Sequence, residues 1–265
     1  MESNFPLIRL SQGHLNLLEI CPPKFQQVYL EQLSSLPNLE QQEKQTWGSR
    51  FHLLMQQREL GLPIESLLQE DEELKHSLIA LIQAAPEIFL SECSIWREAE
   101  HCRTMSFGNY LLTVIYDLLI ADEQKAKILD WKTYLQPQNK TKLATNWQTR
   151  LYLYVLAETS EYLPEQISMT YWFIKLPTKP KSLTFSYSQA QHEKTKQDLT
   201  HLLTDLDNWL KTYRDRQVDF PHYSNCEESC PFYQSLLSSQ ISSTGTEPTK
   251  QNDLTSIKDI EEVAL

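Results

Sequence analysis

Two aspartates and one lysine near the middle of the chain have the types and spacing needed to handle charge at a buried site. Asp117 lies within an apolar run from Val114 to Leu119, where a carboxylate is costly unless it is paired or bound to a metal. Asp130 and Lys132 are two residues apart, so in a strand their side chains share one face. Such a trio can form a buried ion pair. The alternative is a divalent metal site, because one or two carboxylates with water and phosphate suffice to hold Mg²⁺.

The segments that carry these residues predict three short strands joined by turns. Residues 88–99, 110–121 and 127–134 are rich in β-branched and aromatic side chains, which favour strands. Gly108-Asn109 and residues 122–124 lie between them and suit hairpin turns. Asp117 is therefore expected on the second strand, next to the strand that carries Asp130 and Lys132.

Hydrophobic periodicity predicts helices on both sides of these strands, which gives an α/β fold. Ser11 is a candidate N-cap for a helix over residues 11–20, and Pro22 and Pro23 then break or restart that helix. Pro63 can start a further helix. The remaining predicted elements are helices over 44–59, 143–158 and 189–216 and strands over 167–175 and 182–187.

Length and composition favour one domain with a tail. The chain has 265 residues, of which 40% are hydrophobic and 22% charged, as is ordinary for a soluble globular protein. We expect a single domain over residues 1–235. Residues 236–265 are Ser/Thr-rich and acidic with few large side chains, which predicts a mostly disordered tail.

The charge is uneven along the chain. The net charge of -11 excludes a strong, sequence-blind DNA-coating protein, since that binding needs Lys and Arg against phosphate. Residues 59–100 hold ten carboxylates and two basic side chains, whereas residues 123–150 hold six basic side chains and two carboxylates. The stretch around Asp130 is therefore locally basic, and one face could accept an anionic ligand.

Nothing in the chain predicts export or membrane insertion. Residues 1–10 have no apolar core of signal-peptide length, and the apolar stretch over 110–121 is too short to span a bilayer. Five cysteines, an odd number, do not suggest a disulfide framework. A cytoplasmic location is expected.

Asp117 is followed, after twelve positions, by Asp130 and Lys132. Four further motifs occur between residues 11 and 233: Cys21 to Phe25, Trp47 to His52, Glu92, and Gln148 with Tyr152. In their joint order and spacing, these motifs resemble the PD-(D/E)XK nuclease superfamily. The closest likeness is to its RecB-like branch, including the AddB nuclease domain and CRISPR-associated RecB-like exonucleases.

The resemblance implies a fold and a role for each residue. The implied fold is restriction-endonuclease-like, an αβββαβ core with added N-terminal and C-terminal helices. His52, Asp117 and Asp130 would ligate Mg²⁺ or Mn²⁺ together with the backbone carbonyl of Trp131. Lys132 would position the attacking water or offset charge on the phosphate. Gln148 and Tyr152, four apart on one helical face, would orient Lys132 or the DNA backbone, and Glu92 would be a further ligand or support one.

Simpler interpretations exist for several of these residues. His52, on an amphipathic segment between Phe51 and Leu53, could be a packing histidine. Tyr152 could be a core aromatic whose hydroxyl reaches the surface, and Gln148 could be a solvated helix residue.

The chain departs from the family pattern in two places. The glycine usually found three residues before the first Asp is Val114 here. Members with a 4Fe–4S cluster use four cysteines, but only Cys21, Cys226 and Cys230 match, so an intact cluster is not expected. His222 could complete a Cys₃His zinc site.

The expected activity is that of a metal-dependent DNA nuclease that hydrolyses phosphodiester bonds in single strands or at ends, in DNA repair or defence. No helicase motif is present, so a helicase or other partner would have to unwind DNA. Two alternatives stay open: a catalytically inactive nuclease-fold module for nucleic-acid binding or partner docking, and an unrelated enzyme with a chance Asp-x-Lys.

Overall fold

A computed structural model describes residues 7–33, 39–89, 95–134, 139–175 and 179–223. The chain divides into two compact units. The sheet unit comprises Met1–Arg9 and Leu36–Thr195, and the terminal unit comprises Leu10–Ser35 and Lys196–Leu265. The predicted split at residue 235 falls outside the described residues and stays a prediction.

Six strands form one mixed sheet. They are β1 (Ile8–Leu10), β2 (Trp96–Phe107), β3 (Tyr110–Ala121), β4 (Ala126–Lys132), β5 (Ile167–Phe173) and β6 (Lys181–Ser186). Their order is β1-β3-β4-β5-β6, and β2 pairs with β3 off this path. Strands β4 and β5 are parallel, whereas the pairs β2–β3, β3–β4 and β5–β6 are antiparallel. A parallel pair needs a crossover, which here contains α6 (Lys140–Thr145), α7 (Trp147–Glu158) and the short turn η3 (Pro164–Gln166).

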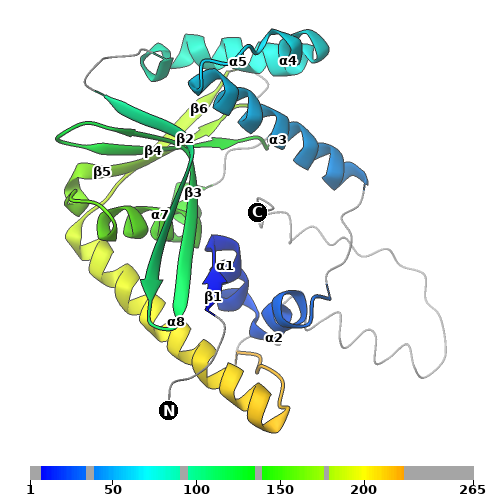
Figure 1. Cartoon of the computed structure of the whole chain (residues 1–265), viewed down its shortest axis with the longest axis vertical. Helices are drawn as coiled ribbons and strands as arrows, with labels where there is room; N and C mark the ends of the chain where they lie inside the picture. The colour runs from blue at the N-terminus through cyan, green and yellow to red at the C-terminus, as the bar shows by residue number, and fades with distance from the viewer. Residues whose placement is uncertain (1–6, 34–38, 90–94, 135–138, 176–178, 224–265) are drawn as a thin grey trace. The chain divides into compact units, whose positions relative to one another are not determined.

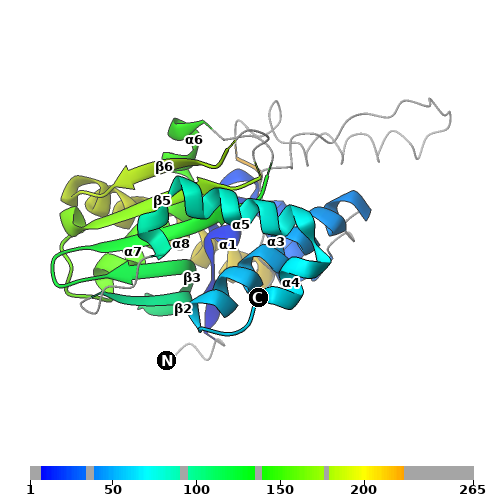
Figure 2. The same cartoon turned by 90° about the horizontal axis from the view of Figure 1, so that it is seen from above.

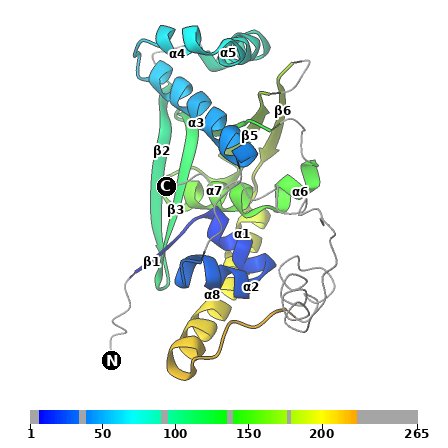
Figure 3. The ribbon, with the colours of Figure 1, turned by 90° about the vertical axis from the view of Figure 1, so that its right-hand side faces the viewer.

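The long β2–β3 hairpin turns at Gly108-Asn109, as predicted. Phe107 pairs with Tyr110 across a two-residue loop, and Gly108 has a φ of 58°, which glycine adopts without a steric cost. Figure 3 shows the two strands side by side over their whole length. This turn fixes which residues of β2 and β3 pair with each other.

Helices lie on both sides of the sheet. Helices α3 (Leu39–Glu59) and α5 (Glu72–Ala84) lie on one side, and α7 lies on the other (Figures 1 and 2). Phe51 and Leu54 of α3 and Leu78 of α5 pack with Leu118 of β3 and Trp131 of β4 in one apolar cluster. This packing holds α3 against the strands that carry the candidate site residues.

Two helices predicted as continuous are each interrupted by a capping residue. The helix expected from Pro63 is two helices, α4 (Glu65–Glu70) and α5, because the Asp71 side chain accepts the Leu74 N–H and starts a new helix. The helix expected over 143–158 is α6 and α7, separated at Asn146, whose side chain accepts the Gln148 N–H. Short polar side chains favour such caps over helix interiors.

The first strand of the hairpin begins later in the chain than the sequence predicts. The expected strand over 88–99 is instead a short helical turn, η2 (Pro86–Phe89), then the undescribed residues 90–94, then β2 from Trp96. Ile88 is buried in the same apolar cluster as α3 and α5, so its hydrophobicity reflects core packing rather than strand pairing. Strand β2 alternates between exposed and half-buried residues, a weaker signal.

The terminal unit is helical. It contains α1 (Gln12–Ile20), α2 (Pro22–Phe25), η1 (Gln26–Leu30) and the later part of α8 (Gln189–Arg216). The side chain of Gln26 donates to Asp219 and accepts the Phe220 N–H, with distances of 2.8 and 2.7 Å. The amide of Gln26 therefore ties the start of this unit to the chain that follows α8.

The predicted α/β class and αβββαβ core are confirmed. Helix α3, strands β2 to β4, helix α7 and strand β5 follow in that order, and β1, β6 and the terminal helices are additions. Among the described residues, no helix is long and apolar enough to cross a bilayer.

Candidate active site

His52 of α3 lies at the centre of a cluster of ligand-type atoms. Its Nε2 is 3.1 Å from the backbone oxygen of Trp131. Its Nδ1 is 3.5 Å from Asp117 Oδ1 and 3.7 Å from Glu100 Oε1. The ligand atoms of His52, Glu100 and Asp117 all lie within 4.8 Å of one another. One helix and two strands thus bring an imidazole and two carboxylates together beside a backbone carbonyl.

Asp117 is fixed at the point where β3 and β4 separate. The regular pairing between the two strands ends at Leu118 and Leu129. Beyond that pair the Trp131 N–H donates to Asp117 Oδ2 at 2.6 Å. A buried N–H needs a partner, and the Asp117 carboxylate supplies it where the ladder stops. The carboxylate is therefore oriented by the backbone of the strand that carries Asp130 and Lys132.

Glu100 reaches the cluster from a strained position in β2. The register pairs Ala99 with Leu118 and His101 with Tyr116, so Glu100 lies opposite Asp117. Its φ is 51°, a left-handed conformation that costs roughly 1–2 kcal/mol in a non-glycine residue. Strain of this kind often marks functional positions.

Lys132, Asp130 and Gln148 form a closed ring of three polar contacts. Lys132 Nζ is 2.7 Å from Asp130 Oδ1 and donates to Gln148 Oε1 at 2.7 Å. Gln148 Nε2 donates to Asp130 Oδ2, also at 2.7 Å. The Lys132 ammonium also lies over the ring of Tyr171, 5.0 Å from its centroid. The Lys132 side chain is therefore held in one place. Asp130 Oδ1 lies close to the Lys132 ammonium but has no hydrogen-bond partner among the described residues.

Helix α7 places Gln148 in this ring. Gln148 is the second residue of α7, and the Asn146 side chain accepts its N–H at 2.8 Å. The six residues Leu151 to Leu156 of α7 are all buried, so the helix cannot slide along the sheet without losing core contacts. One turn later, Tyr152 is buried; burial and then the charges of Asp130 and Asp117 raise its pKa well above the usual value.

The electrostatics of the cluster are those of crowded carboxylates around an imidazolium. Burial raises the pKa of Asp117, which the His52 charge opposes and the Asp130 and Glu100 charges reinforce, to about 7. Burial lowers the His52 pKa, but the three carboxylates outweigh it and raise that pKa to about 9. Protonated His52 thus occupies the position between carboxylates that a cation would favour.

A glycine allows α3 to approach the end of β4. A Cβ added at Gly48 would lie 3.0 Å from Thr133 Oγ1. Gly48 is one turn before His52 on the same helix, so this close approach sets how far the imidazole reaches over the sheet.

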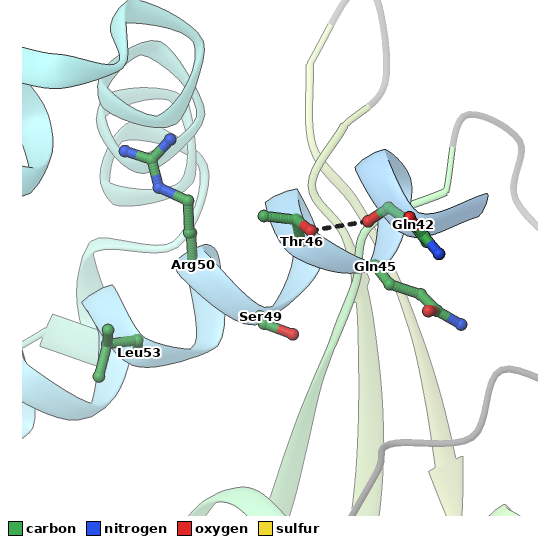
Figure 4. A pocket seen from close by; sticks show the side chains of 6 residues that line it. All are labelled: Gln42, Gln45, Thr46, Ser49, Arg50 and Leu53. Atoms are coloured by element: carbon green, nitrogen blue, oxygen red, sulfur yellow. Dashed lines mark hydrogen bonds between the residues drawn. The ribbon is translucent and has the colours of Figure 1, made fainter. Parts of the chain in front are cut away.

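A separate shallow pocket lies on another face of α3. Its volume is about 500 Å³, and Figure 4 shows that its lining comes from this one helix. Arg50 in this pocket is engaged by Asp71 and Glu70 at 3.0 and 3.9 Å. None of the candidate site residues lines it; the lining residues are Gln42, Gln45, Thr46, Ser49, Arg50 and Leu53.

The donor set of the cluster suits a hard divalent cation. Carboxylate and carbonyl oxygens are the preferred ligands of Mg²⁺ and Mn²⁺, and one imidazole is compatible with Mn²⁺. His52, Glu100, Asp117 and the Trp131 carbonyl provide this set, and a cation would offset the repulsion between the two carboxylates.

The sequence over most of the chain matches a known family. The family model described as the PD-(D/E)XK nuclease superfamily matches residues 9–235, a span that includes every residue of the cluster and of the Lys132 ring. The chain belongs to the PD-(D/E)XK nuclease superfamily. Members of this superfamily are nucleases that use divalent metals. The match does not distinguish branches within the superfamily.

One solved structure has a similar fold. A crystal structure from Eubacterium rectale, of a protein described as a candidate exonuclease, matches with a TM-score of 0.51 and 8% identity over 95% of this chain and 93% of that one. The structure of the protein SSO0001 matches with a TM-score of 0.34 and 12% identity over 77% of each chain, too low to establish a shared fold. No curated protein matches the sequence.

Most site residues predicted from the resemblance come together in this PD-(D/E)XK structure. His52, Asp117 and the Trp131 carbonyl form the cluster, and Lys132 and Gln148 lie beside them. Asp130 is close enough to raise the His52 pKa, and its two oxygens contact Lys132 and Gln148. The roles of these residues stay predictions.

Some predicted residues cannot be placed with the site. Glu92 and the cysteines Cys226 and Cys230 lie outside the described residues. Cys21 is buried in the terminal unit, which also contains His222, and the cluster or zinc interpretation stays a prediction. Val114, at the position of the family glycine, is a buried residue of β3.

Sequence reasoning missed Glu100. The predicted turn at Gly108-Asn109 contains enough information to find it. Across this two-residue turn the numbers of two paired residues add up to 217, so the partner of Asp117 is residue 100. The predicted first strand, residues 88–99, contains Glu92 but ends one residue before Glu100.

Proposed function

We propose that this protein is a divalent-metal-dependent deoxyribonuclease of the RecB-like branch, which hydrolyses phosphodiester bonds by attack of water. The observation that supports this most directly is the convergence of His52, Glu100 and Asp117 on one point, next to the Lys132 ammonium. Cation ligands beside a held positive charge are what hydrolysis of a phosphate diester needs.

The proposed ligands are the side chains of His52, Glu100 and Asp117, the backbone carbonyl of Trp131, and Asp130. A bound Mg²⁺ or Mn²⁺ supplies polarisation of the scissile phosphate and a water of lowered pKa. The protein's part is to hold the two carboxylates in position, with Asp117 buried and Glu100 partly exposed. The Trp131 N–H does this for Asp117, and the hairpin register does it for Glu100.

Lys132 is proposed as the catalytic cation. Its ammonium is only slightly exposed, with 14% of the side-chain surface accessible, and it is held between Asp130 and Gln148. A charge fixed in advance stabilises negative charge that develops on phosphate oxygens without reorganisation during the reaction. In this scheme Gln148 and Tyr152 position Lys132 and Asp130 rather than touch the reacting atoms.

The proposed substrate is single-stranded DNA or a DNA end, in repair or defence, with a helicase or another partner supplying unwound DNA. The net charge of -11 supports delivery by a partner, because such a chain gains little from general attraction to phosphate.

Incubation of the purified protein with labelled single-stranded and duplex DNA tests the proposal. We expect cleavage with Mg²⁺ or Mn²⁺, loss of cleavage with EDTA, and loss in Asp117→Asn and Asp130→Asn. The matched control is Glu123→Gln, which changes an exposed carboxylate in the β3–β4 turn and is expected to cleave like the wild type.

Two results would count against the proposal. Cleavage that persists in EDTA or in Asp130→Asn would exclude the mechanism. Binding of Mn²⁺ and DNA by a wild type that cuts neither form under any metal would favour the inactive nuclease-fold module instead.

A further inference from the structure

Trp96, the first residue of β2, is an unusual surface residue. Its side chain is 46% exposed, and it is the one aromatic among the exposed large apolar residues of the described chain. A large indole left in water costs hydrophobic free energy and often marks a binding surface.

The indole packs edge-on against the imidazole of His101. The ring centroids are 5.2 Å apart and the planes are 85° apart. In a regular strand, residues 96 and 101 would point to opposite faces, since five is an odd separation. The left-handed conformation of Glu100 lies between them and resets the alternation. The same strained residue that enters the candidate metal cluster therefore brings His101 to the Trp96 side.

The His101 ring is a rigid support. Its Nε2 accepts a hydrogen bond from Arg103 Nε at 3.1 Å, which leaves Nδ1 to carry the proton and donate to Glu98 Oε2 at 2.9 Å. Arg103 is anchored in turn by donating to the Thr159 backbone oxygen at 2.7 Å. With both nitrogens engaged, the imidazole cannot rotate without breaking a hydrogen bond.

Aromatic contacts continue from this support to the candidate active site. The His101 ring stacks on the buried Tyr116 ring at 6.2 Å with an interplanar angle of 18°. Tyr116 meets Tyr152 edge-on at 5.3 Å and donates its hydroxyl hydrogen to the Tyr152 backbone oxygen. His101 follows Glu100, and Tyr116 precedes Asp117. The exposed indole is thus the outer end of an aromatic row that runs alongside the proposed metal ligands.

We propose that Trp96 is a stacking platform for one unpaired nucleobase of the strand being cut. The inference rests on the proposed function and specifies its substrate as single-stranded. Aromatic side chains stack on any base, because every base has a π face. A paired base inside a duplex has no free face, so the platform selects unpaired DNA. Residues 59–100 carry eight more carboxylates than basic groups, so this region offers stacking rather than attraction to phosphate.

Binding of short oligonucleotides in EDTA, where hydrolysis is prevented, tests the platform. The probes are a fluorescein-labelled oligothymidylate, a blunt duplex, and oligothymidylates with one abasic position moved along the strand. Stacking contributes about 1–3 kcal/mol per base, so we expect Trp96→Ala to weaken single-strand binding roughly 5-fold to 150-fold. Trp96→Phe is expected to keep most of the affinity. The matched control is Ile79→Ala, which removes an apolar residue of similar exposure from α5.

The abasic series separates stacking from general loss of affinity. For the wild type, one abasic position should weaken binding more than the others. For Trp96→Ala that position should no longer matter, because the base it lacks has no partner. Duplex binding should be the same in all variants.

Three results would overturn the platform. Single-strand affinity unchanged in Trp96→Ala, or single-strand and duplex affinity lowered equally, would exclude it while leaving the nuclease proposal intact if the wild type cleaves. A wild type that neither binds nor cleaves any oligonucleotide would remove the platform and the proposed function together. Normal cleavage with unchanged binding in Trp96→Ala therefore identifies failure of the platform alone.

Discussion

Glu100 lies opposite Asp117 across the β2–β3 hairpin, and the two carboxylates share the imidazole of His52, at 3.7 and 3.5 Å from its Nδ1. A buried carboxylate and a partly exposed one so close to each other repel unless a cation lies between them. In the absence of metal, the protonated imidazole is that cation. The arrangement makes metal binding, pH and stability depend on one another, and each dependence can be measured.

The first prediction concerns Glu100 as a ligand. Glu100→Gln keeps the size of the side chain but removes one negative charge from the cluster, so we expect the Mn²⁺ affinity to fall about tenfold or more, or about 1.4 kcal/mol. Isothermal titration with Mn²⁺ measures this, with Glu123→Gln as the control. An affinity equal to that of the wild type would show that Glu100 is not a ligand.

Metal affinity should rise with pH. The His52 pKa is about 9 and the Asp117 pKa about 7, so near pH 7 the metal must displace protons from both groups. We expect tighter Mn²⁺ binding from pH 6.5 to pH 9, with proton release that is visible when the titration is repeated in buffers of different ionisation enthalpy. His52→Gln should abolish most of the rise between pH 7 and pH 9. A pH-independent affinity in the wild type would contradict the prediction.

The stability of the metal-free protein should change in the opposite direction. Both folded-state pKa values are raised above their unfolded values of 6.5 for His52 and 3.8 for Asp117, so the folded state binds more protons than the unfolded state. The Asp117 contribution is lost as pH rises from about 4 through 7, and the His52 contribution as pH rises from 6.5 through 9. Melting temperatures in EDTA should therefore fall over this range, and His52→Gln should flatten the upper part. A rising melting temperature from pH 7 to pH 9 would argue against a protonated His52.

Lys132 should matter for catalysis and not for metal binding. Lys132→Ala removes a fixed positive charge beside the reacting phosphate, and loss of one such electrostatic group costs roughly 100-fold to 1000-fold in kcat. Mn²⁺ affinity should not fall, because Lys132 is not a proposed ligand and its removal takes a positive charge away from the metal. Cleavage assays and titrations measure the two effects. Lys127→Ala, an exposed lysine on the same strand, is the control, and equal activity in both variants would exclude the proposed role.

Gln148 should act through Lys132. Gln148→Leu breaks its two hydrogen bonds, and buried groups left without a partner cost about 1–3 kcal/mol. We expect a lower melting temperature and lower kcat, with the Mn²⁺ affinity little changed. If kcat does not fall when the melting temperature does, Gln148 is structural only.

Gly48 should set the position of His52. In Gly48→Ala the new methyl group meets Thr133 Oγ1 at 3.0 Å, while helix propensity improves by up to about 1 kcal/mol. We therefore expect near-normal stability but weaker Mn²⁺ binding, because α3 must shift to relieve the contact. Adding Thr133→Ala removes the opposing atom and should restore the affinity. Ser49→Ala on the exposed side of α3 is the control; no rescue in the double variant would contradict the explanation.

The sequence by itself determined the fold class, the hairpin turn and the identity of most candidate site residues. Asp117, Asp130 and Lys132 could be predicted because a charged side chain in an apolar strand is costly unless it is paired or bound to a ligand. Gly108-Asn109 was visible because few dipeptides adopt that turn. His52 and Gln148 came from the resemblance, since a lone histidine or glutamine on a helix carries no signal of its own.

Only the tertiary structure decided which carboxylates meet. The left-handed backbone of Glu100 and the strand register place its carboxylate in the cluster. Helix α7, which is capped at Asn146, places Gln148 against Asp130 and Lys132. Capping residues also interrupt the two helices that hydrophobic periodicity predicts to be continuous. Periodicity records which face of a segment is buried, but a distance between two side chains depends on how separate elements pack. That packing sets the pKa of His52, the place of Lys132 and the exposure of Trp96.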